Sequence, residues 1–477
     1  MASRLNRREF LGVAGAAAVT ASRAALSGEA PAAQRPPNFI ILFADDQGYA
    51  DVGCFGAPKI KTPNLDRMAV EGRKFTSFYV SAPVCTPSRS TLMTGCYAQR
   101  VSLPNVLFPN SQVGISGKEV TIAELLKARG YATACVGKWH LGHLPQFLPT
   151  RHGFDSYLGI PYSNDMWLAA DMAIAKDAKL GPGLSLDDLK KGNRKRNDSP
   201  LLRNEEVIEY PVDQTTLTER YTEEAIRFIT ASKDKPFLLY LPHTMPHYPL
   251  HVSERFKGKS ATGLYGDVIE CLDWSTGQIL DTLRKLGIDQ QTCVIYTSDN
   301  GPAAGSAVPL RGRKGSTWEG GMREPCILRW PGHIPAGTTC DELAATMDLL
   351  PTFAKLAGTQ APTDRVIDGR DIWPLMAGVE GARTPHEAYF YYRGYSLEAV
   401  RSGNWKLHFP RREGRKGDQQ VGPALYDLAA DIGEANNVAG AHADVVKRLE
   451  ALAAQMREDI GDGKKAGKNR RPPGTVG

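Results

Sequence analysis

Residues 84–95 place a thiol and a guanidinium four positions apart in one short segment, Val-Cys-Thr-Pro-Ser-Arg-Ser-Thr-Leu-Met-Thr-Gly. Pro87 suits the first turn of a helix, so we expect Cys85 at the positive end of the helix dipole. Arg89 adds a planar fork of donors that fits a tetrahedral oxyanion such as sulfate or phosphate. A buried, unreactive cysteine is the competing interpretation of Cys85 alone. The whole segment predicts an anion-binding site.

Two pairs of oxygen-bearing side chains each follow an apolar run that we expect to be a buried strand. The first pair follows residues 38–44, and the second follows residues 292–298. Adjacent buried carboxylates are costly unless a cation neutralises them, and oxygen ligands suit Ca²⁺ or Mg²⁺. A solvated acidic turn is the alternative for the first pair. The four predicted ligands are Asp45, Asp46, Asp299 and Asn300.

A lysine and a histidine follow another expected strand. Lys138 and His140 lie between glycines directly after residues 131–136. Surface and core positions are the ordinary roles of a lone lysine and a lone histidine. Because site residues of open α/β sheets gather at strand ends, both are nevertheless predicted to belong to the site.

Loops supply the remaining candidates. His247 has prolines on both sides, which stiffen an extended loop and suit a positioned proton donor, although His243 and His251 compete for this role. Residues 176–204 are polar and basic, which indicates a solvated, partly mobile loop or a lip for a polyanionic substrate. Residues 311–325 are glycine-rich and basic but lack the spacing of a P-loop.

The elements that must position these residues fall into two patterns. Buried strands alternate with helices over residues 38–385, which predicts an α/β domain with a large, mostly parallel sheet between helices. Short aromatic strands and one amphipathic helix over residues 386–460 predict a smaller C-terminal α+β domain with an antiparallel sheet. The basic tail, residues 461–477, is expected to be disordered.

Composition narrows the function classes. The chain has 477 residues and a formal net charge of +6, which gives little reason to expect a nucleic-acid partner. Its eight cysteines show no short paired spacing, which argues against a zinc ribbon or a thioredoxin-like motif. No segment reaches the roughly 20 apolar residues that a transmembrane helix needs.

The first residues of the chain have the pattern of a targeting signal. Asn-Arg-Arg-Glu-Phe-Leu-Gly at residues 6–12, followed by a short apolar run, resembles a twin-arginine export signal. We expect this signal over residues 1–30 and a linker over residues 31–37. A basic amphipathic or disordered start is the alternative. The signal predicts an exported protein, periplasmic or extracellular, with the twin-arginine export machinery as a partner.

Several of these segments resemble one family. Cys-x-Pro-Ser-Arg at 85–89, followed by Leu-x-Thr-Gly at 92–95, is similar to the signature of the type I sulfatases. In that family the cysteine is oxidised to formylglycine by a generating machinery that reads the proline and the arginine. Pro-Tyr-Ser at 161–163 resembles the arylsulfatase A-like subgroup, here as a bacterial exported member. The resemblance covers residues 39–438 and implies an alkaline-phosphatase-like fold and a Ca²⁺ ion, with Mg²⁺ as the alternative.

The resemblance also implies a role for each site residue. The implied metal ligands are Asp45, Asp46, Cys85, Asp299 and Asn300, with Cys85 as the modified residue. The implied catalytic residues are Cys85, Arg89, Lys138, His140, His247 and Lys314. The implied substrate-binding residues are Ser163, Lys138, His247 and Lys314.

The implied reaction is hydrolysis of a sulfate monoester, with a sulfated carbohydrate as the preferred substrate class. A hydrated aldehyde offers two hydroxyls on one carbon, one to attack sulfur and one whose deprotonation expels sulfate. A phosphomonoester or phosphonate ester hydrolase of the same superfamily is the nearest alternative. A non-catalytic sulfoglycan-binding protein is the other.

Overall fold

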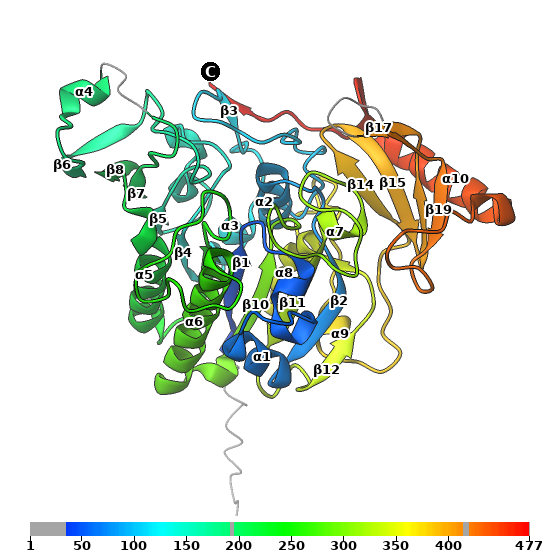
Figure 1. Cartoon of the computed structure of the whole chain (residues 1–477), viewed down its shortest axis with the longest axis horizontal. Coiled ribbons are helices and arrows are strands. Elements are labelled where there is room, and N and C mark those ends of the chain that lie inside the picture. Colours follow the sequence, from blue (N-terminus) through cyan, green and yellow to red (C-terminus); the bar gives the residue numbers. More distant parts are fainter. Residues whose placement is uncertain (1–34, 191–194, 414–418, 477) are drawn as a thin grey trace, which may run out of the picture. The chain divides into compact units, whose positions relative to one another are not determined.

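Strand β1 (Asn38–Ala44) lies near the centre of the larger sheet in a computed structural model that describes residues 35–190, 195–413 and 419–476 (Figure 1). Every residue of β1 is buried. Alternate side chains of a strand point to opposite faces of its sheet, so an unbroken apolar run fits a strand that is covered on both faces. The expected signal at residues 1–30 and the basic residues 191–194 lie outside the described residues.

Twelve strands within the described residues form this larger sheet, in the order β12-β2-β11-β10-β1-β9-β4-β5-β7-β8-β6, with β13 beside β2. The five strands from β10 to β5 are parallel, and the flanking strands include antiparallel pairs. Besides β1, the strands are β2 (Arg73–Tyr79), β4 (Ala132–Val136), β5 (Ser156–Gly159), β6 (Ala173–Leu180), β7 (Leu201–Arg203), β8 (Glu206–Tyr210), β9 (Phe237–Pro242), β10 (Thr292–Ser298), β11 (Arg323–Arg329), β12 (Thr338–Cys340) and β13 (Ala344–Ala345).

Helices cover both faces of the larger sheet. One face packs on α2 (Cys85–Thr94), α3 (Ile122–Lys127) and α8 (Leu349–Leu356). The other face packs on α1 (Pro63–Val70), α5 (Leu217–Ser232) and α6 (Leu264–Lys285). The shorter helices are α4 (Leu186–Lys190), α7 (Glu319–Met322) and α9 (Trp373–Met376), and 3-10 turns occur at Tyr49–Asp51, Gly53–Phe55, Pro145–Phe147, Pro149–Arg151, Gln214–Thr216, Asp289–Gln291, Thr346–Asp348 and Ala439–Ala441.

The C-terminal part has its own antiparallel sheet. Its four strands are β14 (Tyr389–Arg393), β15 (Ser396–Ser402), β16 (Trp405–His408) and β19 (Ala424–Asp427). Helix α10 (Ala443–Asp459) packs on this sheet through Leu449, Leu452 and Ala453 (Figure 1). The predicted fold class is therefore confirmed: a mixed, mostly parallel sheet between helices, and a smaller antiparallel sheet with one helix.

The expected disorder of residues 461–477 is wrong for the part of the tail that is described. Strands β20 (Gly461–Asp462) and β21 (Lys465–Ala466) pair with each other, and β22 (Gly474–Thr475) pairs with β3 (Val113–Gly114). Arg471 also forms an ion pair with Glu119 at 2.7 Å. The basic residues that suggested disorder are thus partly neutralised by carboxylates of the preceding chain.

A further short pair joins β17 (Arg411–Glu413) to β18 (Gln419–Val421). All eight cysteines lie within the described residues and are free thiols. Within residues 35–190, 195–413 and 419–476, no helix has both the length and the apolar character needed to cross a membrane.

Candidate active site

The ends of neighbouring parallel strands bring the predicted site residues together. Asp45 and Asp46 follow β1, and Asp299 follows β10, which pairs with β1 in register up to Ala44 and Ser298. The backbone amide of Asp46 donates to Asp299 Oδ1 at 3.0 Å. Lys138 follows β4, which is separated from β1 by one strand, β9. Carboxyl ends of parallel strands share one sheet edge, as the sequence predicts.

Carboxylates and cations alternate in this cluster. Lys138 Nζ lies 2.7 Å from Asp45 Oδ2, and Lys314 Nζ lies 2.7 Å from Asp46 Oδ2. Both carboxylates are almost completely buried. Buried charges of this kind are tolerated only when they are paired, so each lysine offsets the desolvation of one aspartate.

Cys85 lies at the middle of the cluster. Its Sγ is 3.7 Å from Asp45 Oδ1 and 3.7 Å from Lys314 Nζ, and the residue is only 2% exposed. Burial raises the pKa of the Cys85 thiol to about 12 and outweighs the opposing charges of Lys138 and Lys314. The thiolate is the nucleophilic form of cysteine, so the unmodified thiol is a poor nucleophile at neutral pH.

Helix α2 positions Cys85 and Arg89 from one side. All ten of its residues are buried, and the hydroxyls of Ser90, Thr91 and Thr94 donate to backbone carbonyls of the preceding turn, as Thr91 Oγ1 does to Pro87 O at 3.0 Å. The helix ends at Gly95, whose φ of 66° is favourable only for residues such as glycine. Pro87 lies in the first turn, as predicted, and Cys85 is the first helical residue.

Arg89 uses its fork on protein groups. Its Nε and Nη2 donate to Asp299 Oδ2 at 3.2 and 2.8 Å, and its Nη1 donates to the carbonyl of Lys138 at 3.0 Å. Arg89 is completely buried. The guanidinium therefore fixes Asp299 and the chain after β4.

The carboxylates repel one another enough to shift their titration. Burial acts to raise the pKa of Asp45, but Lys138, His247 and Arg89 overcome it and hold this pKa well below its usual range. Burial and the charge of Asp45 raise the pKa of Asp299 to about 7 even though Arg89 is bonded to it. A divalent cation would relieve this repulsion.

The donor atoms fit such a cation. Asp45, Cys85 and Asp299 each offer a ligand atom within 4.8 Å of the others, and so do Asp46, Cys85 and His247. Asn300 Oδ1 is buried and lacks a hydrogen-bond partner in the described part of the chain. Hard oxygen donors of this type suit Ca²⁺ or Mg²⁺.

His140 is held as a neutral imidazole with a defined tautomer. Its Nε2 donates to the carbonyl of Leu107 at 3.0 Å, because a carbonyl oxygen can only accept. Its Nδ1 is therefore unprotonated, and it is buried without a hydrogen-bond partner among the described residues. Burial and the charge of Lys138 hold the pKa of His140 well below its ordinary value. The residue can accept a proton at Nδ1.

Ser163 and His247 complete the cluster. Ser163 Oγ lies 3.1 Å from Lys138 Nζ and 3.1 Å from His247 Nε2. His247 Nδ1 donates to the carbonyl of Tyr248 at 2.6 Å and also lies 3.0 Å from Asn164 Oδ1, so Nε2 faces Ser163 and Asp46. Burial lowers the pKa of His247, although the nearby aspartates oppose this shift.

Two residues near the site escaped the sequence interpretation. Asn164 orients His247, and its neighbour Ser163 is the only signal that could have indicated it. Glu324 is fully buried on β11, and within the described residues neither of its carboxylate oxygens has a hydrogen-bond partner. Burial and the charges of Asp299 and Asp46 raise its pKa well above the ordinary value. The sequence interpretation assigns Glu324 to the basic segment 311–325, where a carboxylate gives no signal of burial.

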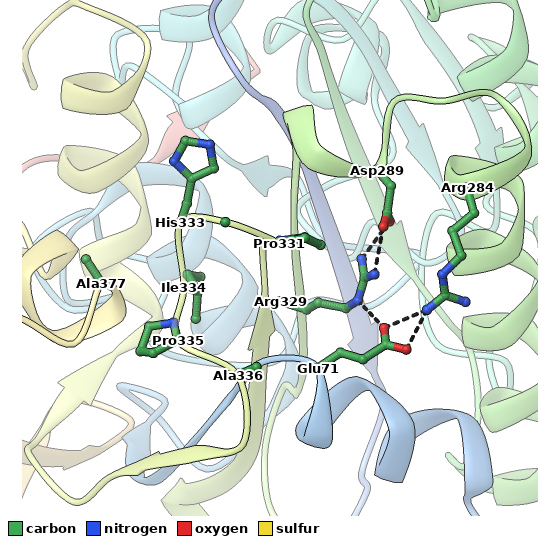
Figure 2. Close-up of a pocket in the computed structure, with 11 residues that line it drawn as sticks. Glu71, Arg284, Asp289, Arg329, Pro331, His333, Ile334, Pro335, Ala336 and Ala377 are labelled. Carbon is green, nitrogen blue, oxygen red and sulfur yellow. Dashed lines mark hydrogen bonds and ion pairs between the residues drawn. The ribbon is translucent and has the colours of Figure 1, made fainter.

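A pocket of about 670 Å³ lies apart from these residues (Figure 2). Arg329 forms ion pairs with Glu71 at 2.6 Å and with Asp289 at 2.7 Å, and Arg284 pairs with Glu71 at 2.6 Å. Its arginines are therefore already neutralised, and none of the predicted site residues lines it. The cluster around Cys85 is the better candidate for chemistry.

Known proteins show the same organisation. Residues 37–359 match the family model described as Sulfatase, and residues 384–472 match the C-terminal region of aryl-sulfatase. The chain is 40% identical over 462 residues to arylsulfatase A of Homo sapiens, which covers 89% of each chain. It is 41% identical over 406 residues to N-acetylgalactosamine-6-sulfatase of Canis lupus familiaris, covering 80% of this chain and 73% of the relative.

A solved structure agrees with these relatives. The crystal structure of Ps i-CgsB in complex with k-i-k-neocarrahexaose aligns with a TM-score of 0.75 at 29% identity and covers 88% of this chain and 93% of that chain. The family models together span most of the sequence, and the curated relatives exceed 30% identity over most of it. The resemblance of the Cys85 segment is thereby confirmed. The chain belongs to the sulfatase family, as an arylsulfatase A-like type I enzyme with an alkaline-phosphatase-like fold.

Proposed function

We propose that this sulfatase cleaves a sulfate monoester of a carbohydrate after Cys85 has been converted to formylglycine. The observation that carries the proposal is the position of Cys85, 3.7 Å from both Asp45 Oδ1 and Lys314 Nζ, with a pKa of about 12. A protonated thiol is a poor nucleophile, so the unmodified cysteine does not explain why charged groups surround this position. The hydrate of an aldehyde at this position supplies one hydroxyl for attack and a second for the release of sulfate.

The proposed metal is Ca²⁺, with Mg²⁺ as the alternative. Its ligands would be Asp45, Asp46, Asp299, Asn300 and the side chain at position 85, whose donor atoms support this choice. When bound, such a cation acidifies a coordinated hydroxyl and withdraws negative charge from the sulfuryl oxygens.

The two lysines bind the group that is transferred. Lys138 and Lys314 bring their ammonium groups to the carboxylates that surround position 85. Positive charge held beside a developing oxyanion in a buried site stabilises the transition state more than it would in water. The sequence expectation gives Arg89 a part in binding the transferred group, but three of its five N–H donors are bonded to Asp299 and the Lys138 carbonyl. We assign Arg89 to holding Asp299 in place.

The two histidines handle protons. His247 Nδ1 already donates to the Tyr248 carbonyl, so His247 can give up a proton from Nε2 only as the imidazolium, a form that the charges of Asp45 and Asp46 favour. In that form, with Nε2 directed at Ser163 and Asp46, His247 is the proposed acid for the leaving oxygen. His140 is neutral and has its Nδ1 lone pair free of partners within the described residues, so it is the proposed base for the second hydroxyl. Ser163 lies between Lys138 and His247 and is proposed to contact the substrate.

Two of the similar proteins support a carbohydrate as the substrate class. One relative is named N-acetylgalactosamine-6-sulfatase, and one similar structure holds k-i-k-neocarrahexaose. Both names favour a carbohydrate. The twin-arginine sequence at residues 6–12 supports an exported protein, periplasmic or extracellular, that would meet such material outside the cytoplasm.

A mass measurement tests the proposal directly. The protein is produced together with a formylglycine-generating enzyme, and the peptide that contains Cys85 is analysed for the aldehyde. Turnover of an aryl sulfate, an aryl phosphate and a panel of sulfated sugars is then compared. We expect the aldehyde in active preparations and a preference for sulfate over phosphate. Full activity with an unmodified thiol would sink the mechanism, and a preference for phosphate would favour the phosphohydrolase alternative.

A further inference from the structure

The segment that carries Lys314 is attached to other parts of the chain in its middle and at its ends. We call residues 311–319 the Lys314 loop. In the middle, Lys314 N donates to Pro302 O at 3.2 Å and Gly315 N donates to Pro83 O at 2.9 Å. Gly320 N donates to Arg311 O at 2.7 Å, which closes the loop at its base. Gly312 and Gly315 have φ values of 86° and 82°, a region that costs other residues energy. The middle bonds fix the backbone at Lys314, and what holds the two ends determines the course of the chain on either side of it.

A lysine of the C-terminal sheet holds one end. Lys406 on β16 is completely buried, and its Nζ donates to Thr317 O and Glu319 Oε1, each at 2.9 Å. The same Nζ lies 2.9 Å from Glu434 Oε1. An ammonium group has three donors, so the three oxygens satisfy it completely. Two of these oxygens belong to the Lys314 loop.

Glu434 and Glu398 add further attachments. Glu434 Oε2 accepts from the backbone amide of Glu319 at 2.7 Å, and the Glu434 carbonyl accepts from Arg311 Nη1 at 2.8 Å. Thr317 Oγ1 donates to Glu398 Oε2 at 2.8 Å. Both ends of the Lys314 loop are thus bonded to the C-terminal part of the chain.

The Lys314 loop is attached through buried ion pairs, although apolar contacts in the same place would cost less desolvation free energy. Without Lys406, the buried carboxylates of Glu319 and Glu434 would face each other across a site that excludes water. A buried ion pair adds little net stability compared with apolar residues of the same size. It does fix geometry, because each donor accepts only a narrow range of directions. The network is better suited to placing the loop than to stabilising the fold.

We propose that Lys406 is a positioning residue for Lys314. In this way the C-terminal subdomain determines where the ammonium group that binds sulfate lies in the active site. Lys406 touches neither substrate nor metal in this role. It acts through Thr317 and Glu319, at the C-terminal end of the Lys314 loop. The inference rests on the proposed role of Lys314 in sulfate ester hydrolysis.

The test uses the whole, modified enzyme and a double-mutant cycle. Lys406→Met, Lys314→Ala and the double variant are compared with the wild type for kcat and KM on an aryl sulfate. Lys447→Met, an exposed lysine on α10 of the same subdomain, is the matched control. A misplaced site group costs about 100-fold in rate, so we expect about that loss for Lys406→Met. In the Lys314→Ala background the same change should cost no more than about twofold, because its target is gone.

Hydrogen exchange provides a readout that does not depend on turnover. We expect faster amide exchange in residues 311–319 of Lys406→Met, with the exchange of β1 and β10 unchanged. Thr317→Val, which removes one attachment and no buried charge, is the second variant if Lys406→Met fails to fold, and it should show the same pattern with a smaller loss.

Two results would overturn the inference. Equal losses from Lys406→Met in both backgrounds would mean a general effect on folding, and unchanged exchange in residues 311–319 would mean that Lys406 does not hold the loop. A wild type without sulfatase turnover would instead contradict the proposed function. In that case the exchange measurement alone decides whether Lys406 places the loop.

Discussion

At the scale of single residues, the site depends on which atoms are already engaged. Cys85 is surrounded by charges yet keeps its proton, and three of the five N–H donors of Arg89 are bonded to protein oxygens. The sequence identifies both as candidates because of their types and spacing. It cannot tell that burial keeps the thiol protonated or that the guanidinium bonds to protein oxygens, since both facts depend on residues 40 or more positions away.

Replacing Cys85 by serine or by alanine distinguishes the roles of the two hydroxyls of the proposed hydrate. Cys85→Ser offers one hydroxyl, so it can attack sulfur but has no second hydroxyl with which to expel sulfate. We expect at most one leaving group released per Cys85→Ser chain, and none from Cys85→Ala. A rapid-mixing assay with an aryl sulfate counts the released groups. Sustained turnover by either variant contradicts the mechanism.

Arg89→Lys tests whether the guanidinium holds the metal site or the substrate. A lysine cannot reproduce the fork on Asp299 and the Lys138 carbonyl. We expect Ca²⁺ affinity, measured by calorimetry, to fall about 10- to 100-fold, as for other partners of metal ligands. Unchanged Ca²⁺ affinity together with a raised KM would show that Arg89 contacts the sulfate instead.

At the scale of elements, the parallel strands do most of the positioning. The apolar runs of β1 and β10 predict buried strands, and parallel pairing then forces Asp45 and Asp299 to one sheet edge. This much of the site could be derived from periodicity. The Lys314 loop could not, because its attachments come from Lys406 and Glu434, about 90 to 120 residues later in the chain. No local pattern encodes such pairs.

The proposed metal ligands come from two strand ends, those of β1 and β10, and from the start of α2, so Ca²⁺ should bind the folded state and not the unfolded chain. We expect added Ca²⁺ to raise the free energy of unfolding by about 2.7 kcal/mol at 100 times the dissociation constant. Asn300→Ala removes one oxygen donor without leaving an unpaired charge and should weaken this effect. Urea unfolding with and without Ca²⁺ measures it. An equal Ca²⁺ effect in the wild type and the variant would exclude Asn300 as a ligand.

At the scale of the whole molecule, the end of the chain returns to the catalytic domain. Strand β22 pairs with β3, and Arg471 bonds to Glu119 with both Nε and Nη2. The composition of residues 461–477 predicts disorder and gives no sign of the β22–β3 pairing or of the Arg471–Glu119 contact. Composition reports how strongly a segment is hydrated, but it does not report whether a buried carboxylate elsewhere needs a partner.

Arg471→Met should destabilise the protein although it lies six residues from the end of the chain. The change leaves Glu119, whose side chain is 3% exposed, without its closest cation. Breaking a buried pair costs about 3–5 kcal/mol, and the partial exposure of Arg471 reduces our expectation to about 2 kcal/mol. Urea unfolding measures the loss. Lys468→Met, at an exposed ion pair of the same tail, should cost under about 0.5 kcal/mol.

His152 makes the stability of the fold sensitive to acid. Burial lowers its pKa from 6.5 to about 4, so the unfolded chain binds more protons than the folded one between these values. Stability is therefore fully present above pH 6.5 and falls as the pH drops towards 4, by up to about 1.4 kcal/mol per pH unit. We expect His152→Gln to lose less free energy of unfolding between pH 7 and pH 5 than the wild type. Equal losses would contradict this assignment.

The complete burial of α2 determines whether Cys85 can be oxidised before or after the chain folds. An enzyme that oxidises Cys85 must reach its sulfur, and in the finished fold Cys85 is 2% exposed beneath its neighbours. Part of that cover is Lys314, whose Nζ lies 3.7 Å from Cys85 Sγ and which is made about 230 residues after Cys85. At about 5–20 residues per second, synthesis takes roughly 11–46 s to reach it. The proposed oxidation of Cys85 would thus take place on the growing or unfolded chain, and a molecule that folds before the conversion would stay inactive for as long as it remains folded.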